Sequence, residues 1–322
     1  MKNQILNPTI DLGQYSHQII TENLQRFVDQ EKAVFKDQDS EPLHQMRVGM
    51  RRLRTAVQVF GPAIVLPKTV SHSSIGKIAK RLGATRDLDV LFQKLKSHYQ
   101  PLLQGTEQEN FDKVLKKLRK KRAQSFLQLK EILKADRYLH LKQSIQSWID
   151  QPAYTSMGAL PVVQVLSDLL LPLICEIFLH PGWLVGTTMQ VGNVMLIKDP
   201  AVLNQQLTQF GDLLHDLRKQ MKGVRYQAEF FSRFYDPDYL KAIQEFKTIQ
   251  DILGELQDRA VLRQFLESTL NANLLNVLPI VSQIYQQEQI EFWQRWQPLQ
   301  KRYLSLDFRQ SMRSLLITPL AS

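Results

Sequence analysis

The stretch that decides the fold is LHQMRVGMRRLRTAVQVF, residues 43–60. On a helix, at about 100° per residue, His44, Arg47, Arg51 and Arg54 fall within roughly 80° of arc. The neighbouring arc is apolar and carries Leu43, Met46, Met50, Leu53, Val57 and Phe60. The segment therefore predicts a helix on which a basic stripe runs beside an apolar stripe, and we expect the apolar stripe to pack into a bundle.

The same helical periodicity extends along almost the whole chain, while alternating strand patterns with hairpin signals are scarce. We therefore expect an all-α fold. The expected helices lie at 15–36, 41–60, 71–99, 107–135, 138–150, 161–179, 200–235, 237–268, 279–302 and 306–316.

Composition restricts the class of partner. The 322 residues are 43% hydrophobic, which is enough for a sizeable core, and the net charge of +10 favours polyanions. Cys175 is the single cysteine, so an internal disulfide is excluded and a cytoplasmic location is expected. The start of the chain lacks the apolar core of a signal peptide. The apolar segment at 161–180 is interrupted by Asp168, Pro172 and Glu176, which predicts a buried, kinked helix and no membrane span.

The opening segment recurs later in the chain. LHDLRKQMKGVRYQAEFF, residues 214–231, repeats it at an offset of 171, so that His215, Arg218, Lys222 and Arg225 match the first basic stripe. The offset also holds on the next helix, where LGATRDLDVL at 82–91 matches LGELQDRAVL at 253–262. This pattern indicates an internal duplication that forms two pseudo-symmetric, antiparallel helical bundles. We expect the first bundle and an N-terminal extension in 1–180, a packed connector in 181–200 and the second bundle in 201–322.

Two rows of basic side chains suit a chain of phosphate groups. Arginine offers a rigid fork of donors and lysine a compact charge, and helical spacing places successive side chains within reach of neighbouring phosphates. A histidine at the head of each row, His44 and His215, would donate a hydrogen bond to phosphate and favour binding at mildly acidic pH. The alternatives are a solvated basic face and structural histidines, although duplication of the row argues against plain solvation.

Further basic residues follow the first row. A helix at 111–130 carries an unduplicated basic face, which either extends the binding surface or is simply solvated: Lys113, Lys116, Lys117 and Lys120. Asp87 is duplicated, and we expect it to hold neighbouring basic side chains, the alternative being a structural ion pair or cap. Zinc, EF-hand, nucleophile-elbow, phosphate-loop and dinucleotide motifs are absent from the sequence, so we expect no metal, no cofactor and no enzyme activity.

The paired motifs, in this order and over about 15–316, resemble the CHAD family, the conserved-histidine α-helical domains. The resemblance implies two four-helix bundles and binding of inorganic polyphosphate in a basic central cavity. The basic positions that it carries over are His44, Arg47, Arg51, Arg52 and Arg54 in the first half, and His215, Arg218, Lys219, Lys222, Arg225 and Tyr226 in the second. Lys77, Lys80 and Arg81 lie where the family tends to place further basic residues. No E-x-E-x-K signature of a triphosphate-tunnel domain is present, which implies a stand-alone binding module.

The leading hypothesis is a non-enzymatic, cytoplasmic polyphosphate-binding protein, with association to polyphosphate granules as a further implication. The alternative is a nucleic-acid-binding protein that contacts the phosphate backbone, although the rows lack interleaved stacking aromatics apart from Tyr226. A phosphohydrolase or polyphosphate kinase is a third hypothesis, and it lacks an evident nucleophile and an acidic metal cage.

Overall fold

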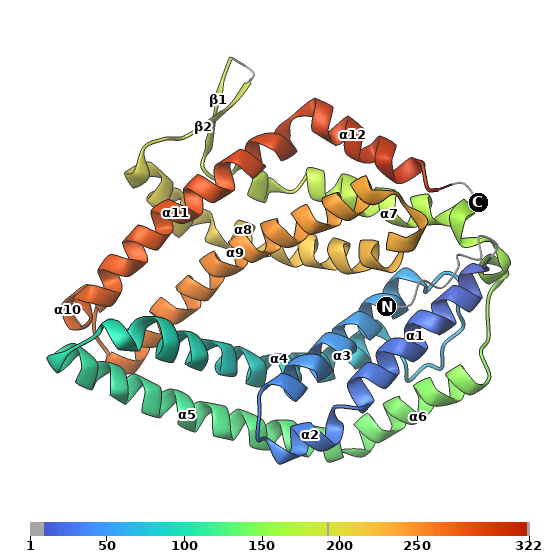
Figure 1. Cartoon of the computed structure of the whole chain (residues 1–322), viewed down its shortest axis with the longest axis horizontal. Coiled ribbons are helices and arrows are strands. Elements are labelled where there is room, and N and C mark those ends of the chain that lie inside the picture. The colour runs from blue at the N-terminus through green and yellow to red at the C-terminus, as the bar shows by residue number, and fades with distance from the viewer. Residues whose placement is uncertain (1–9, 192, 321–322) are drawn as a thin grey trace. The chain divides into compact units, whose positions relative to one another are not determined.

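The computed structural model describes residues 10–191 and 193–320 (Figure 1). The prediction of an all-α fold is confirmed, since helices make up nearly all regular structure in the described residues and one short hairpin is the exception. The chain divides into two units, the first ending at Val165 and the second beginning at Leu166. Each unit is described separately below.

The first unit is built around α3 and α4. α3 packs against α1 on one side and α4 on the other, and α4 also packs against α5 and α6. A five-residue π-helical turn, Leu95–Tyr99, and a 3-10 turn, Gln100–Leu102, follow α4, and a second 3-10 turn, Ser156–Ala159, follows α6. The helices are α1 (Leu12–Val28), α2 (Glu31–Lys36), α3 (Glu41–Val59), α4 (His72–Lys94), α5 (Gly105–Lys134) and α6 (Asp136–Asp150). α7 (Val162–Phe178) then leads into the second unit.

The second unit begins with α7 and has α8 and α9 at its centre. α8 packs along α9, which also contacts α10, α11 and α12. Short 3-10 turns occupy Pro181–Leu184 and Ser232–Phe234. The remaining elements are β1 (Thr187–Gln190), β2 (Asn193–Leu196), α8 (Pro200–Phe230), α9 (Pro237–Leu270), α10 (Leu274–Val277), α11 (Pro279–Leu304) and α12 (Leu306–Ile317).

α3 forms as its sequence predicts. Proline in its first turn has the φ that a helix needs and no N–H to satisfy. Its apolar stripe is buried, and each large side chain there contributes about 1.5–3 kcal/mol by leaving water. Gly49 lets α1 approach closely, because a Cβ at this position would lie 2.9 Å from the Cβ of Phe27 and 3.0 Å from its backbone nitrogen. The packing of α1 and α3 therefore depends on a glycine at this point.

The division between the units differs from the predicted boundary after residue 180. Residues of α7 beyond Val165 bind the second unit: the Ser167 hydroxyl donates a hydrogen bond to the carbonyl of Leu316 at 2.8 Å. The predicted connector 181–200 also begins in the second unit's core, where the Trp183 ring stacks on Tyr303 at a centroid distance of 4.6 Å. The boundary lies earlier because tertiary contacts, which leave no mark on local periodicity, assign α7 and the following turn to the second unit.

Other differences from the predicted elements are local. The helix expected at 15–36 is two helices, since α1 ends at Val28 and α2 begins at Glu31. The hairpin and α10 were not predicted. The hairpin strands are exposed or half-buried along their length, so neither face needs the apolar alternation that would have indicated a strand.

One helical segment, Val162–Leu184, is long and apolar enough to cross a membrane, as judged by length and composition. A third (33%) of its apolar window is buried within the protein. Its exposed positions include Gln164, Asp168, Pro172 and Glu176, which are four residues apart and follow one side of the helix. This pattern is typical of an amphipathic helix that packs on a globular unit.

Candidate functional site

The first basic row lies on α3, beside the stripe that this helix buries. We call His44, Arg47, Arg51 and Arg54 the α3 row. All four side chains are half-buried, and the Nε atoms of Arg51 and Arg54 are themselves buried. Arg52 is also half-buried and lies about 100° around the helix from Arg51, to one side of the row.

The α3 row is held against α4. The Arg54 guanidinium lies over Gly76, where a Cβ would be 3.2 Å from its central carbon, and its Nη2 is 3.4 Å from Nδ1 of His72. Further along, Arg47 forms an ion pair with Asp87 at 3.1 Å. This contact fits both the expected positioning role of Asp87 and its alternative, a structural ion pair. Because the Asp87 side chain is 67% exposed, the pair adds little stability.

A matching arrangement recurs on α8 and α9 at the offset of 171. We call His215, Arg218, Lys222 and Arg225 the α8 row. A Cβ on Gly83 would lie 3.5 Å from Nε of Arg47, and a Cβ on Gly254 would lie 2.9 Å from Nη2 of Arg218. In each unit, an arginine of the basic row thus lies against a glycine of the second helix, and in the second unit it lies so close that a Cβ would displace it.

Arg225 of the α8 row contacts three neighbouring side chains. Its Nε donates a hydrogen bond to Oε1 of Gln250 at 3.0 Å, and its Nη1 forms an ion pair with Glu229 one turn along α8. Its guanidinium also lies 4.3 Å from the ring centroid of Tyr226. Tyr226 is buried, so it can support Arg225 but offers no open face on which a nucleic-acid base could stack.

Lys219 lies beside the α8 row and forms an ion pair with a carboxylate. Its Nζ is 2.9 Å from Oδ1 of Asp216, whose other oxygen is 3.2 Å from Nε2 of His180. The hydrogen bonds from Lys219 and His180 lower the pKa of Asp216 to about 2. Asp216 is therefore ionised at any physiological pH and compensates much of the Lys219 charge.

Both histidines at the heads of the rows have lowered pKa values. Burial is the main cause for His44, and the charge of Arg86 adds to it. Burial is again the main cause for His215, followed by the charges of Lys219 and Arg218. Both imidazoles are therefore mainly neutral at pH 7 in the free protein, and an anion placed between them and the basic residues would raise their pKa values.

The other predicted basic residues lie elsewhere in the first unit. Lys77, Lys80 and Arg81 are exposed on α4, and they line cavities that α4 forms with α6 and with the end of α5. The four predicted lysines of α5 are also exposed and line neither of these cavities: Lys113, Lys116, Lys117 and Lys120. The structure thus brings the α4 residues to these two cavities and places the four α5 lysines outside them.

Some basic residues near these surfaces were not among the predicted site residues. Arg137 and His140 of α6 line the cavities beside α4, and no sequence motif marks them. Their three-residue spacing on one helix face is the available signal. Arg122 of α5 is basic but occupied, since it forms ion pairs with Asp37 and, at 2.8 Å, with Asp89.

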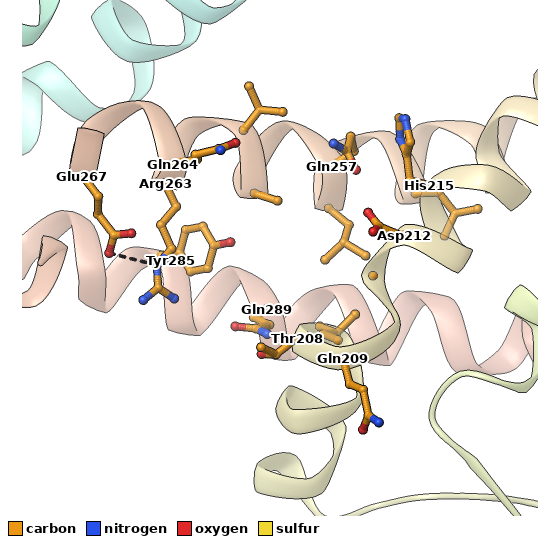
Figure 2. Close-up of a pocket in the computed structure, with 16 residues that line it drawn as sticks. Thr208, Gln209, Asp212, His215, Gln257, Arg263, Gln264, Glu267, Tyr285 and Gln289 are labelled. Atoms are coloured by element: carbon orange, nitrogen blue, oxygen red, sulfur yellow. Dashed lines mark hydrogen bonds and ion pairs between the residues drawn. The ribbon is translucent and has the colours of Figure 1, made fainter. Parts of the chain in front are cut away.

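The α8 row begins at a cavity of about 460 Å³ between α8, α9 and α11. Figure 2 shows His215 and Asp212 toward one end of this cavity, and Tyr285 beside the Arg263–Glu267 ion pair toward the other. Glutamine amides supply much of its remaining polar lining: Gln209, Gln257, Gln264 and Gln289. Away from the His215 end, this cavity offers glutamine amides and an arginine that is paired with a glutamate, so it lacks the uncompensated positive charge that a phosphate chain would need.

Within residues 10–191 and 193–320, no group of three or more His, Cys, Asp or Glu side chains is arranged to hold a metal ion. Cys175 is half-buried and does not form a disulfide. The chemistry that the described site offers is therefore that of arginine, lysine and imidazole donors arranged along two helices.

Comparisons with known proteins agree with this architecture. A family model described as CHAD domain matches residues 18–267. The crystal structure of the CHAD domain from the plant Ricinus communis is similar, with a TM-score of 0.55 and 21% identity over 99% of this chain and 97% of that one. PptA from Streptomyces chartreusis has a TM-score of 0.56 and 14% identity over 89% of this chain and 99% of that one. A search of curated proteins found no match. Because the family model covers most of the chain, and the all-α fold agrees with it, this protein belongs to the CHAD domain family.

Proposed function

We propose that this protein binds inorganic polyphosphate through the α3 and α8 rows, without chemical turnover. The observation that carries the proposal is the recurrence, at one offset, of a basic row whose arginine lies against a glycine of the next helix. CHAD domains as a family are linked to polyphosphate binding and metabolism. The specific ligand and the absence of turnover are our inference for this chain.

The chemistry of the rows suits a phosphate chain. Phosphate oxygens are singly charged acceptors that recur at short intervals, and charge-assisted hydrogen bonds to them are roughly twice as strong as neutral ones. Arg47 and Arg218 present guanidinium forks whose positions are limited by the adjacent helix. The half-buried stems reduce the side-chain entropy that binding would otherwise cost.

Binding should be electrostatic and sensitive to salt. With about eight phosphate contacts, the rule for single-stranded nucleic acids gives a log–log salt slope of about −5 to −6. We propose that nucleic acid competes poorly with polyphosphate for the rows. Tyr226, the aromatic residue that lies on the same face of α8 as the row, is buried beneath Arg225, so its ring cannot stack on a base.

The first test is a competition titration. Labelled long-chain polyphosphate is bound to the full-length protein at near-physiological salt and challenged with double-stranded DNA, single-stranded RNA and tripolyphosphate at equal charge concentrations. We expect the nucleic acids to displace little of the polyphosphate. Displacement by DNA or RNA at equal or lower concentration would favour a general nucleic-acid-binding function instead.

A variant test addresses the two rows. Arg51→Gln with Lys222→Gln removes one charge from each row, and Lys241→Gln with Lys301→Gln removes two exposed charges away from the rows. We expect the first pair to weaken polyphosphate binding at least tenfold, the second to change it less than twofold, and both to leave the helical circular dichroism spectrum unchanged. Equal effects of the two pairs would contradict the assignment to the rows.

Absence of turnover and cellular location are tested separately. Polyphosphate incubated with the protein and Mg²⁺ or Mn²⁺, with and without ADP, should keep its length and yield no phosphate or ATP. Any turnover that exceeds a no-protein control would contradict a binding-only role. We also propose a cytoplasmic location on polyphosphate granules, so a fluorescent fusion should colocalise with polyphosphate stain and become diffuse in the Arg51→Gln/Lys222→Gln variant.

A further inference from the structure

A second basic surface lies in the first unit, in the groove that α4 forms with α6 and the end of α5. Two cavities of about 550 and 500 Å³ adjoin there, and both are lined by Lys77, Ile78 and Arg137. We call their combined surface the α4–α6 groove. Its basic and imidazole residues are Lys68, Lys77, Lys80, Arg81, Arg137 and His140, and its hydroxyl residues are Thr69, Ser71, Ser73 and Ser74.

Within residues 10–191 and 193–320, no ion pair compensates the positive charges of this groove. Among the described residues that line it there is no carboxylate. Arg81 donates a hydrogen bond to a neutral partner, Oε1 of Gln128, at 3.2 Å. Lys77 and Arg137 are exposed, and neither forms an ion pair with the described residues. Like charges that converge without counter-charges repel one another, and a bound anion would relieve that repulsion.

The second unit contains the corresponding groove, between α9 and α12, with opposite chemistry. Five lining positions correspond at the offset of 171: Ser71 to Ala242, Ser74 to Glu245, Arg137 to Phe308, His140 to Ser311 and Leu141 to Met312. The cations of the second groove are paired, Lys241 with Asp238 at 2.6 Å and Arg302 with Glu245 at 3.5 Å. The fold therefore builds a groove in each unit, but only the groove of the first unit is left with uncompensated positive charge among the described residues.

Lys80 lies on α4 between the α3 row and the α4–α6 groove. This residue lies four positions after Gly76 and three before Gly83, so it shares the α4 stripe against which the arginines of the α3 row lie. Lys80 is exposed and also lines the cavity that contains Arg81 and Arg137. An anionic chain can thus pass from the α3 row across α4 into the groove while remaining in contact with positive charge.

We infer that the α4–α6 groove is a second phosphate-binding surface, which takes a further length of the polyphosphate chain that the α3 row binds. Lys77, Arg81 and Arg137 supply charge-assisted donors, and the Ser73 hydroxyl adds a neutral one. This inference rests on the proposed function. It predicts that the first unit contacts more phosphates than the second and that a short oligophosphate, which cannot span both surfaces, gains nothing from the groove.

The test compares two variants that lose the same net charge. Lys77→Gln with Arg137→Gln neutralises the groove, and Lys241→Gln with Lys301→Gln serves as the control, since Lys241 occupies the corresponding groove of the second unit. Binding of long-chain polyphosphate and of tripolyphosphate is measured by titration at four salt concentrations. All four side chains are exposed, so we expect both proteins to fold. Should the double groove variant not fold, the single variants Lys77→Gln and Arg137→Gln replace it, each with an expected loss of about two- to threefold.

We expect the double groove variant to bind long-chain polyphosphate about three- to tenfold more weakly, with a salt slope smaller in magnitude by about 1.4 for the two lost contacts. Its affinity for tripolyphosphate should match the wild type, and the control should change less than twofold. Equal long-chain affinities of the groove variant and the control would overturn the inference and leave the proposed function standing. A wild-type protein that does not bind polyphosphate refutes the proposed function itself.

Discussion

The substitution Gly254→Ala is expected to displace the guanidinium of Arg218 without destabilising the fold. It therefore tests whether the position of this guanidinium matters for binding. Its new Cβ would lie 2.9 Å from Nη2, 3.0 Å from Nε and 3.3 Å from Cζ of Arg218. The guanidinium must therefore move by about 0.5 Å or more to restore ordinary contact distances. That movement disturbs the long hydrogen bond, 3.4 Å, from its Nε to the carbonyl of Gln250. The end of an arginine side chain can shift at low cost, so the fold should accommodate the change.

Gly254→Ala should affect stability and binding in opposite directions. Alanine in the interior of α9 is favoured over glycine by about 0.5–1 kcal/mol, which predicts an unchanged or higher Tm, by up to about 4 °C. Displacing one charge-assisted contact costs about 0.5–1 kcal/mol of binding, which is about two- to fivefold in Kd. Gly254→Ala should therefore weaken polyphosphate binding without destabilising the protein.

Gly83→Ala is the matched control, because it makes the same change at the duplicated position of the first unit. There the new Cβ would be 3.5 Å from Nε of Arg47, which is ordinary van der Waals contact. Calorimetric titration with long-chain polyphosphate and thermal melting of both variants provide the measurements. If Gly254→Ala binds as tightly as the wild type, or if Gly83→Ala loses as much affinity, the role assigned to the Arg218 position is wrong.

Two further predictions concern pH and buried charge. Because the pKa values of His44 and His215 are lowered on folding, the unfolded chain takes up protons first, and the free protein should lose stability as pH falls below about 6.5. Polyphosphate should bind more tightly over the same interval, since it favours the charged imidazoles, and a Kd that stays constant between pH 7.5 and 5.5 would remove this role. Asp37→Asn should lower the free energy of unfolding by about 1–3 kcal/mol, because it leaves the partly buried Arg122 with one carboxylate partner, while asparagine tolerates the local φ of +53°. Asp87→Asn removes an exposed carboxylate and should change the unfolding free energy by less than about 1 kcal/mol in the same urea titration, so equal losses would refute the distinction.

Periodicity predicted most of the helices and failed where local sequence carries no signal. α3 and α9 occupy nearly their predicted ranges, since a long apolar stripe indicates both the helix and the face that it buries. The boundary between the units was placed too late because Ser167 and Trp183 join the second unit through contacts with residues more than 100 positions away. No local pattern encodes such contacts.

The candidate site was predictable in part. The sequence placed His44 and His215 at the heads of two basic rows, and the structure shows each histidine half-buried on the predicted helix. The sequence did not show that Lys219 forms an ion pair with Asp216, or that Tyr226 is buried beneath Arg225. Ion pairs and burial depend on which helix packs alongside, and the sequence spacing of one helix does not specify that.

By itself, the sequence determined that the chain is helical, that its basic rows recur at a fixed offset, and that Gly83 and Gly254 recur with them, because these properties follow from residue order and the 3.6-residue period. Only the tertiary structure decided where the uncompensated charge lies. Corresponding grooves form in both units, yet Arg137 faces lysines in one while Phe308 stands beside paired charges in the other. The physical reason is that electrostatic compensation depends on the distances between charged groups on different helices. Those distances are set only when the helices of each unit pack together.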